Sequence, residues 1–70
     1  MMSESPLREL LVVSTLAEAE VIASRLRAAG IQAELPDRHM AMIYPSTALG
    51  GIRILVPASE YEWALDVLGR

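Results

Sequence analysis

Residues 14–35 read STLAEAEVIASRLRAAGIQAEL, and this stretch decides the fold. Thr15 and Glu18 stand at the spacing of a capping box, in which a hydroxyl and a carboxylate satisfy free amides of the first helical turn. Gly30 stands where a left-handed residue ends many helices. Between them, small and apolar residues recur at helical spacing on one side: Ala19, Ile22, Ala23, Leu26 and Ala29. The stretch therefore predicts a helix over 16–29.

Three segments have the pattern of strands. Over 31–35, apolar residues alternate with Gln32 and Glu34, as in a half-buried strand, and Pro36 stops the segment. The same alternation recurs over 52–56, after two glycines that suit a tight turn or bulge. Residues 7–14, LRELLVVS, are apolar and end in a β-branched pair. We predict strands at all three places.

A second helix follows the last strand. Ser59 and Glu62 form another capping box, and Gly69 is placed to end the helix. Its apolar stripe consists of Tyr61, Ala64, Leu65 and Leu68. The element order is then β-α-β-β-α. This order predicts an α+β, ferredoxin-like two-layer sandwich with a three-stranded antiparallel sheet and two helices on one face. We expect one domain over 1–70, with residues 1–6 disordered.

Two stretches resemble a known family. EAEVIASRLRAAGIQAEL (18–35) is similar to its pattern E-A-x-x-I-x-x-x-L-x-x-x-G-I-x-A, and GGIRILVPASEYEWALDVL (50–68) is similar to its G-G-I-R segment and acidic helix. The family is a small prokaryotic one of unknown function, assigned to signal transduction, with a PII-like (GlnB-like), ferredoxin-related fold. In PII proteins a long arm joins strands 2 and 3. Residues 36–51 take that place here and are called the arm below, although no PII nucleotide-binding motif is found.

The first strand presents apolar residues on both faces. Leu10 and Val12 fall on one face and two other apolar residues on the opposite one, so one face meets the helices and the other is open. Leu55 is expected on the open face, and no proline or lysine protects the strand edge. A second subunit, or the arm folding across the sheet, is expected to cover this surface.

The arm contains DRHMAMIY (37–44), with the single histidine of the chain. A Cu(I) site of His39, Met40 and Met42 is disfavoured, because an extended chain points the histidine away from both methionines. A catalytic site is disfavoured because no nucleophile stands in a recognised setting. We therefore predict no metal, no catalytic residue and no cofactor. The residues expected to make contacts are Met40, Met42, Ile43, Tyr44, Leu10, Val12, Leu55 and Trp63.

The totals limit the function classes. A net charge of −3 argues against nucleic acid as a partner, and no apolar run is long enough to span a membrane. Cysteine is absent, which excludes disulfides, and no signal peptide is visible, so a cytoplasmic location is expected.

We predict a non-enzymatic regulatory or signal-transducing interaction module that acts through its sheet edge and the arm. It is expected to form homo-oligomers, a dimer first, and to bind an unidentified protein partner. The alternative is a sensor that binds a nucleotide or metabolite between subunits. A small enzyme is a further alternative.

Overall fold

The computed structural model describes residues 6–70, so the disorder expected for the N-terminus falls mainly on residues 1–5, outside the described part. Within residues 6–70, two strands, four α-helices and one 3₁₀ turn follow one another. They are β1 (Leu7–Val13), α1 (Leu16–Ala28), α2 (Arg38–Ala41), α3 (Ser46–Leu49), β2 (Ile52–Pro57), η1 (Ala58–Glu60) and α4 (Tyr61–Leu68). The prediction of an α+β fold is confirmed.

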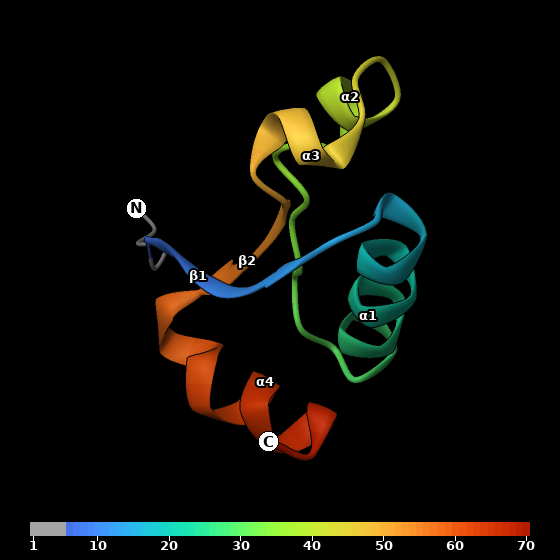
Figure 1. Ribbon diagram of the computed structural model, residues 1–70. Coiled ribbons are helices and arrows are strands. Elements are labelled where there is room, and N and C mark those ends of the chain that lie inside the picture. Colours follow the sequence, from blue (N-terminus) through green and yellow to red (C-terminus); the bar gives the residue numbers. More distant parts are fainter. Residues whose placement is uncertain (1–5) are drawn as a thin grey trace.

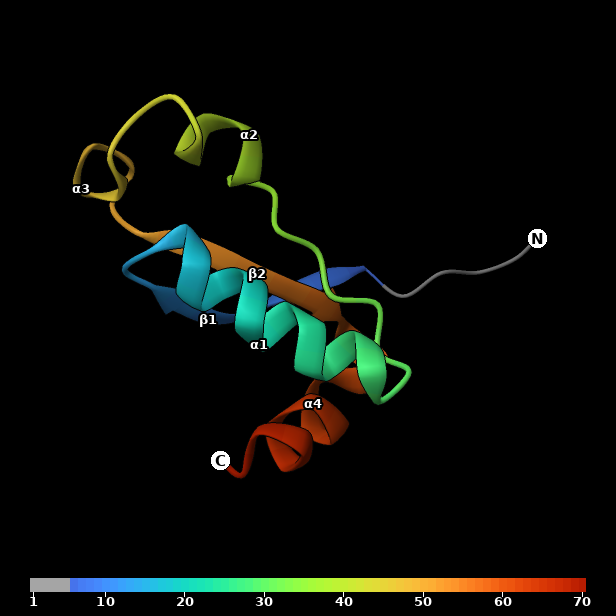
Figure 2. The same cartoon turned by 90° about the vertical axis from the view of Figure 1, so that its right-hand side faces the viewer.

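The sheet consists of β1 and β2, which pair antiparallel. One face carries Ile52, Ile54 and Val56, all fully buried. Helices α1 and α4 pack against each other and against this face, as Figures 1 and 2 show. The apolar alternation of β2 therefore directs one set of side chains into a single core between the sheet and two helices.

The structure corrects the predicted position of Leu10. The alternation of β1 placed it on the open face beside Val12, but it is only 8% exposed and belongs to the core. A bulge is the reason: Glu9 pairs with Leu55 and Leu11 pairs with Ile54, so Leu10 is an extra residue in β1. An extra residue reverses the alternation along a strand. Val12 stays on the open face, opposite Arg53 of β2.

The third strand predicted at 31–35 forms a single bridge instead of a ladder. Glu34 and Leu55 exchange both main-chain hydrogen bonds, at 2.8 and 2.9 Å. Continued in this register, the pairing would set residue 32 opposite Pro57 and Pro36 opposite residue 53. Because proline has no N–H to donate, neither neighbouring position can complete a pair. The predicted burial of Ile31 and Ala33 nevertheless holds.

The helix ends follow the sequence in three cases of four. The N–H of Glu18 donates to Oγ1 of Thr15 at 3.1 Å, and paired main-chain bonds close the C-terminal turns at Gly30 and Gly69. The exception is Ser59. It lies inside η1, so it does not precede a helix, and neither η1 nor α4 has a side-chain cap at its start.

The arm, expected to be irregular, contains the single-turn helices α2 and α3. Figures 1 and 2 show them at one end of the sheet, on the side away from α4. From these two helices, Ala41 and Leu49 pack against the core, and both are half-buried. The arm thus projects from the domain and does not fold across the sheet.

Candidate functional site

One carboxylate fastens the start of the arm to the sheet. Asp37 accepts three hydrogen bonds from Arg53 of β2: Oδ2 accepts from the main-chain N–H at 2.9 Å and from Nε at 3.1 Å, and Oδ1 accepts from Nη2 at 2.9 Å. The N–H of Arg53 lies on the same edge of β2 as the Leu55 bridge. The Asp37 carboxylate therefore substitutes for the backbone of a third strand.

These bonds set the protonation of Asp37. Side-chain hydrogen bonds from Arg53, and then the main-chain bond, hold the pKa of the Asp37 carboxyl below its ordinary value, although partial burial opposes them. The same contact raises the pKa of the Arg53 guanidinium. Both groups are therefore charged at neutral pH, and the connection is a bidentate ion pair.

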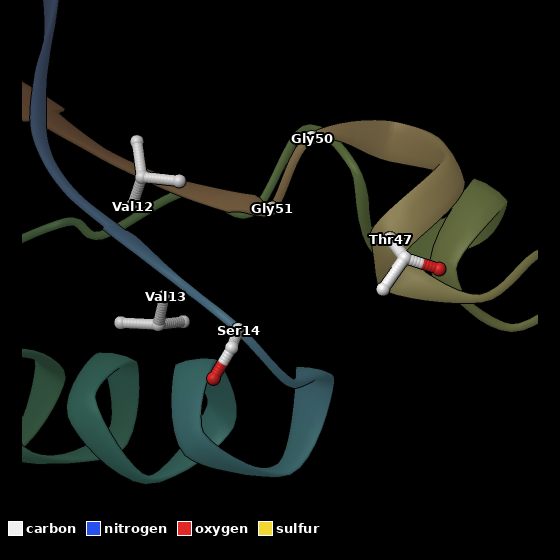
Figure 3. Close-up of a pocket in the computed structure, with 6 residues that line it drawn as sticks. All are labelled: Val12, Val13, Ser14, Thr47, Gly50 and Gly51. Atoms are coloured by element: carbon white, nitrogen blue, oxygen red, sulfur yellow. The ribbon is translucent and has the colours of Figure 1, made fainter.

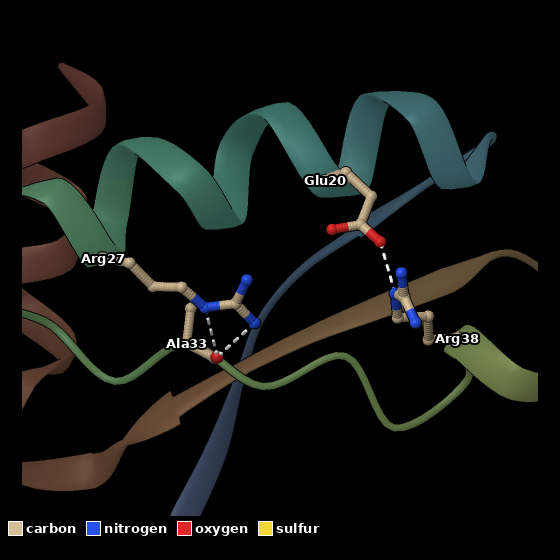
Figure 4. Close-up of polar contacts among 4 residues, drawn as sticks. All are labelled: Glu20, Arg27, Ala33 and Arg38. Atoms are coloured by element: carbon tan, nitrogen blue, oxygen red, sulfur yellow. Dashed lines mark hydrogen bonds and ion pairs between the residues drawn. The ribbon is translucent and has the colours of Figure 1, made fainter.

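Two further contacts hold the segment 33–38, which leads into the arm, against α1, as Figure 4 shows. Nε of Arg38, the first residue of α2, donates to Oε2 of Glu20. Further along, Arg27 donates from Nε and Nη2 to the carbonyl oxygen of Ala33, at 3.2 and 2.8 Å. The segment leading into the arm is thus held between α1 on one side and β2 on the other.

The predicted contact residues of the arm are exposed. The exposed fractions are 43% for Met40, 61% for Met42, 58% for Ile43 and 49% for Tyr44. Four large apolar side chains are thus exposed within five positions of a short segment, and we call this group the arm patch. The sequence left open whether the arm covers its own sheet. It does not, because Val12 on the open face is itself 48% exposed.

The other predicted contact residues do not join the arm patch. Leu55 is half-buried on the open face with Val12, while Leu10 lies in the core. Trp63 is 46% exposed on α4, where its ring lies next to Gly30 at the end of α1. Figure 1 places α4 on the opposite side of the sheet from the arm. The structure therefore separates an arm patch, an open sheet face and an isolated tryptophan.

A pocket opens where the chains of β1 and β2 diverge, and we call it the fork pocket (Figure 3). It has a volume of about 350 Å³ and is lined by Val12, Val13, Ser14, Thr47, Gly50 and Gly51. Figure 3 shows the end of β1 on one side and α3 on the other, and the two glycines connect α3 to the start of β2. Sequence reasoning treated the glycines as a turn and found none of this pocket.

The described residues contain neither a cluster of metal-ligating side chains nor a candidate membrane-spanning helix. Across 6–70, no three His, Asp or Glu side chains gather in a way that could hold a metal ion. Within the same range, no helix has both the length and the apolar character needed to cross a membrane.

Comparison with models of known protein families shows which family the chain belongs to. A family model described as "Putative prokaryotic signal transducing protein" matches residues 7–70, which is nearly the whole chain. The chain belongs to this family. The resemblance read from residues 18–35 and 50–68 is confirmed at this level, and the family description indicates a role in signal transduction. No curated protein and no solved structure matches the chain.

Proposed function

We propose that this family member is a non-enzymatic regulatory module that transmits a signal by binding a protein partner through the arm patch. The supporting observation is that Met40, Met42, Ile43 and Tyr44 are exposed on a segment fastened at its start by Asp37. A surface held in place loses little conformational freedom on binding, so more of its contact energy appears as affinity. Contiguous exposed apolar side chains mark interaction sites on small proteins.

The open sheet face and the free edge of β1 form a second surface, for which we propose self-association as a dimer. Within residues 6–70, β1 pairs with β2 alone, so its other edge is available to a second copy. Val12 and Leu55 would lie beside this contact. A reduced PII-like, ferredoxin-like arrangement is part of this proposal. It is supported by the bridge of Glu34 to the edge of β2 away from β1.

The partner proposal is tested by capture with two matched variants. In the arm variant, Met42, Ile43 and Tyr44 are replaced by serine. In the control, Val21 of α1, which is 62% exposed, is replaced by serine. A protein retained by wild type and control but lost by the arm variant supports the arm patch as the docking site. Equal retention by all three proteins refutes it. Light scattering over a concentration series tests the dimer, and a monomer throughout refutes that part.

A small-molecule sensor is the second candidate, and the fork pocket is the observation that favours it. The reason is its position: the pocket touches the arm through α3 and the sheet through the end of β1. A molecule bound there would contact the element that carries the arm patch. Binding and partner recognition would then be coupled.

A further inference from the structure

The fork pocket has the size of a small-molecule site. Its volume of about 350 Å³ lies within the range of known ligand pockets, which is roughly 300 to 1,000 Å³. Two of its lining residues, Val12 and Val13, provide branched apolar side chains at the end of β1. The pocket is formed by two separate segments of the chain, 12–14 and 47–51, so it depends on the fold.

The composition of the lining limits the ligand. Of the six lining residues, two are valines, two are glycines, and Ser14 and Thr47 carry hydroxyl groups. None of the six is charged. The lining therefore supplies no opposite charge to pair with phosphates, carboxylates or ammonium groups, and such groups gain no ionic contact there. An uncharged molecule with an apolar body instead gains by covering the apolar side chains at the end of β1.

The glycines keep the pocket open toward the arm. A Cβ added at Gly50 would meet nothing within 4 Å, whereas one added at Gly51 would lie 2.5 Å from Cγ1 of Val12. Gly51 therefore allows the main chain to approach β1, and Gly50 leaves free space at the end of α3. An occupant would contact both the fixed sheet and the segment that enters the arm.

We propose that the fork pocket binds a small, uncharged, largely apolar molecule that holds α3 against the end of β1. This inference rests on the second candidate function and names its ligand class. It is independent of the arm patch, because none of the lining residues belongs to that patch. A nucleotide is not the expected occupant, because its phosphates would find no cationic side chain in the lining.

The test uses indole as the neutral probe and indole-3-carboxylate as its charged counterpart, added to the ¹⁵N-labelled full chain. We expect indole to cause saturable amide shifts in residues 12–14 and 47–51, and hydrogen exchange of the α3 amides to slow. We expect the carboxylate to bind more weakly, because no lining residue carries a positive charge. Thr47→Trp fills the pocket from an exposed position and removes the saturable shifts. Ala48→Trp, on the next exposed residue of α3, is the control and leaves them unchanged.

Three results would overturn the proposal. They are shifts that grow without saturation, equal binding of the neutral and charged probes, and equal indole binding by the two tryptophan variants. Saturable binding without slower exchange in α3 would also refute the claim that the occupant holds this helix. The arm patch is tested separately, because Thr47→Trp leaves Met42, Ile43 and Tyr44 in place. Failure of the pocket therefore leaves partner capture by the arm unaffected.

Discussion

Replacing Gly51 by alanine tests how closely the base of the arm approaches the sheet. Gly51 has φ +108°, and left-handed backbone costs an L-residue roughly 1–2 kcal/mol. The new Cβ would also lie 2.5 Å from Cγ1 of Val12 and 3.3 Å from the carbonyl oxygen of Val13. Val12 is half-exposed and can turn away, at a cost of about 0.5–1.5 kcal/mol for leaving its rotamer. We expect a total loss of about 2–3 kcal/mol in the free energy of unfolding.

Gly50→Ala is the matched control. Its φ is +73°, but its Cβ would meet nothing within 4 Å, so only the backbone cost of roughly 1–2 kcal/mol applies. Thermal and urea unfolding followed by circular dichroism measure both variants. A difference of about 1 kcal/mol corresponds to roughly 4–8 °C in Tm for a domain of this size. Adding Val12→Ala should remove the extra loss of stability in Gly51→Ala, because the clashing methyl group is gone. The same addition should give no such recovery in Gly50→Ala. Equal losses in the two glycine variants, or no rescue, would refute the steric argument.

Two further predictions concern polar contacts. Because Arg53 holds the pKa of Asp37 below its unfolded value of about 4, this pair stabilises the fold above that pH and loses its effect as pH falls through the folded pKa. Urea unfolding at a series of pH values should therefore show a flatter acid dependence in Asp37→Asn than in wild type; parallel curves would contradict this. Thr15→Ala removes the cap on the Glu18 N–H and should cost about 1 kcal/mol in unfolding free energy, whereas Ser59→Ala should cost less than about 0.5 kcal/mol. Equal costs would contradict the observed helix starts.

Local patterns predicted the two longer helices, α1 and α4, but not the single-turn helices of the arm, because capping signals and helical periodicity need more than one turn to act. The hydroxyl of Thr15 and the turn at Gly30 lie within one helical turn of the residues they serve. Helix α4 shows a further limit: Ser59 and Glu62 have capping-box spacing, yet the chain enters a 3₁₀ turn first and the box does not form. A spacing rule identifies the helix but does not fix its first residue.

Strand patterns predicted burial better than pairing. Ile31 and Ala33 are buried as their alternation requires, but a ladder also needs a donor at each position, and Pro36 and Pro57 remove two. That conflict becomes visible only when the register is known, because it depends on which residues face each other. The bulge at Leu10 is of the same kind, since one extra residue in β1 matters only relative to β2. The fork pocket likewise could not be predicted, because its lining comes from segments far apart in the sequence.

The exposure of the arm patch is informative because the chain is small. A 70-residue domain has a free energy of unfolding of roughly 4–10 kcal/mol. Burying a large apolar side chain completely contributes roughly 1.5–3 kcal/mol, so four that remain about half-exposed forgo several kcal/mol in total. That amount is comparable with the whole stability of the domain. At the same time, Asp37 and Arg38 hold the start of the arm to β2 and α1, away from the open face that Met42, Ile43 and Tyr44 could otherwise cover. A segment both apolar and held off its own sheet is best explained by a surface that another molecule buries.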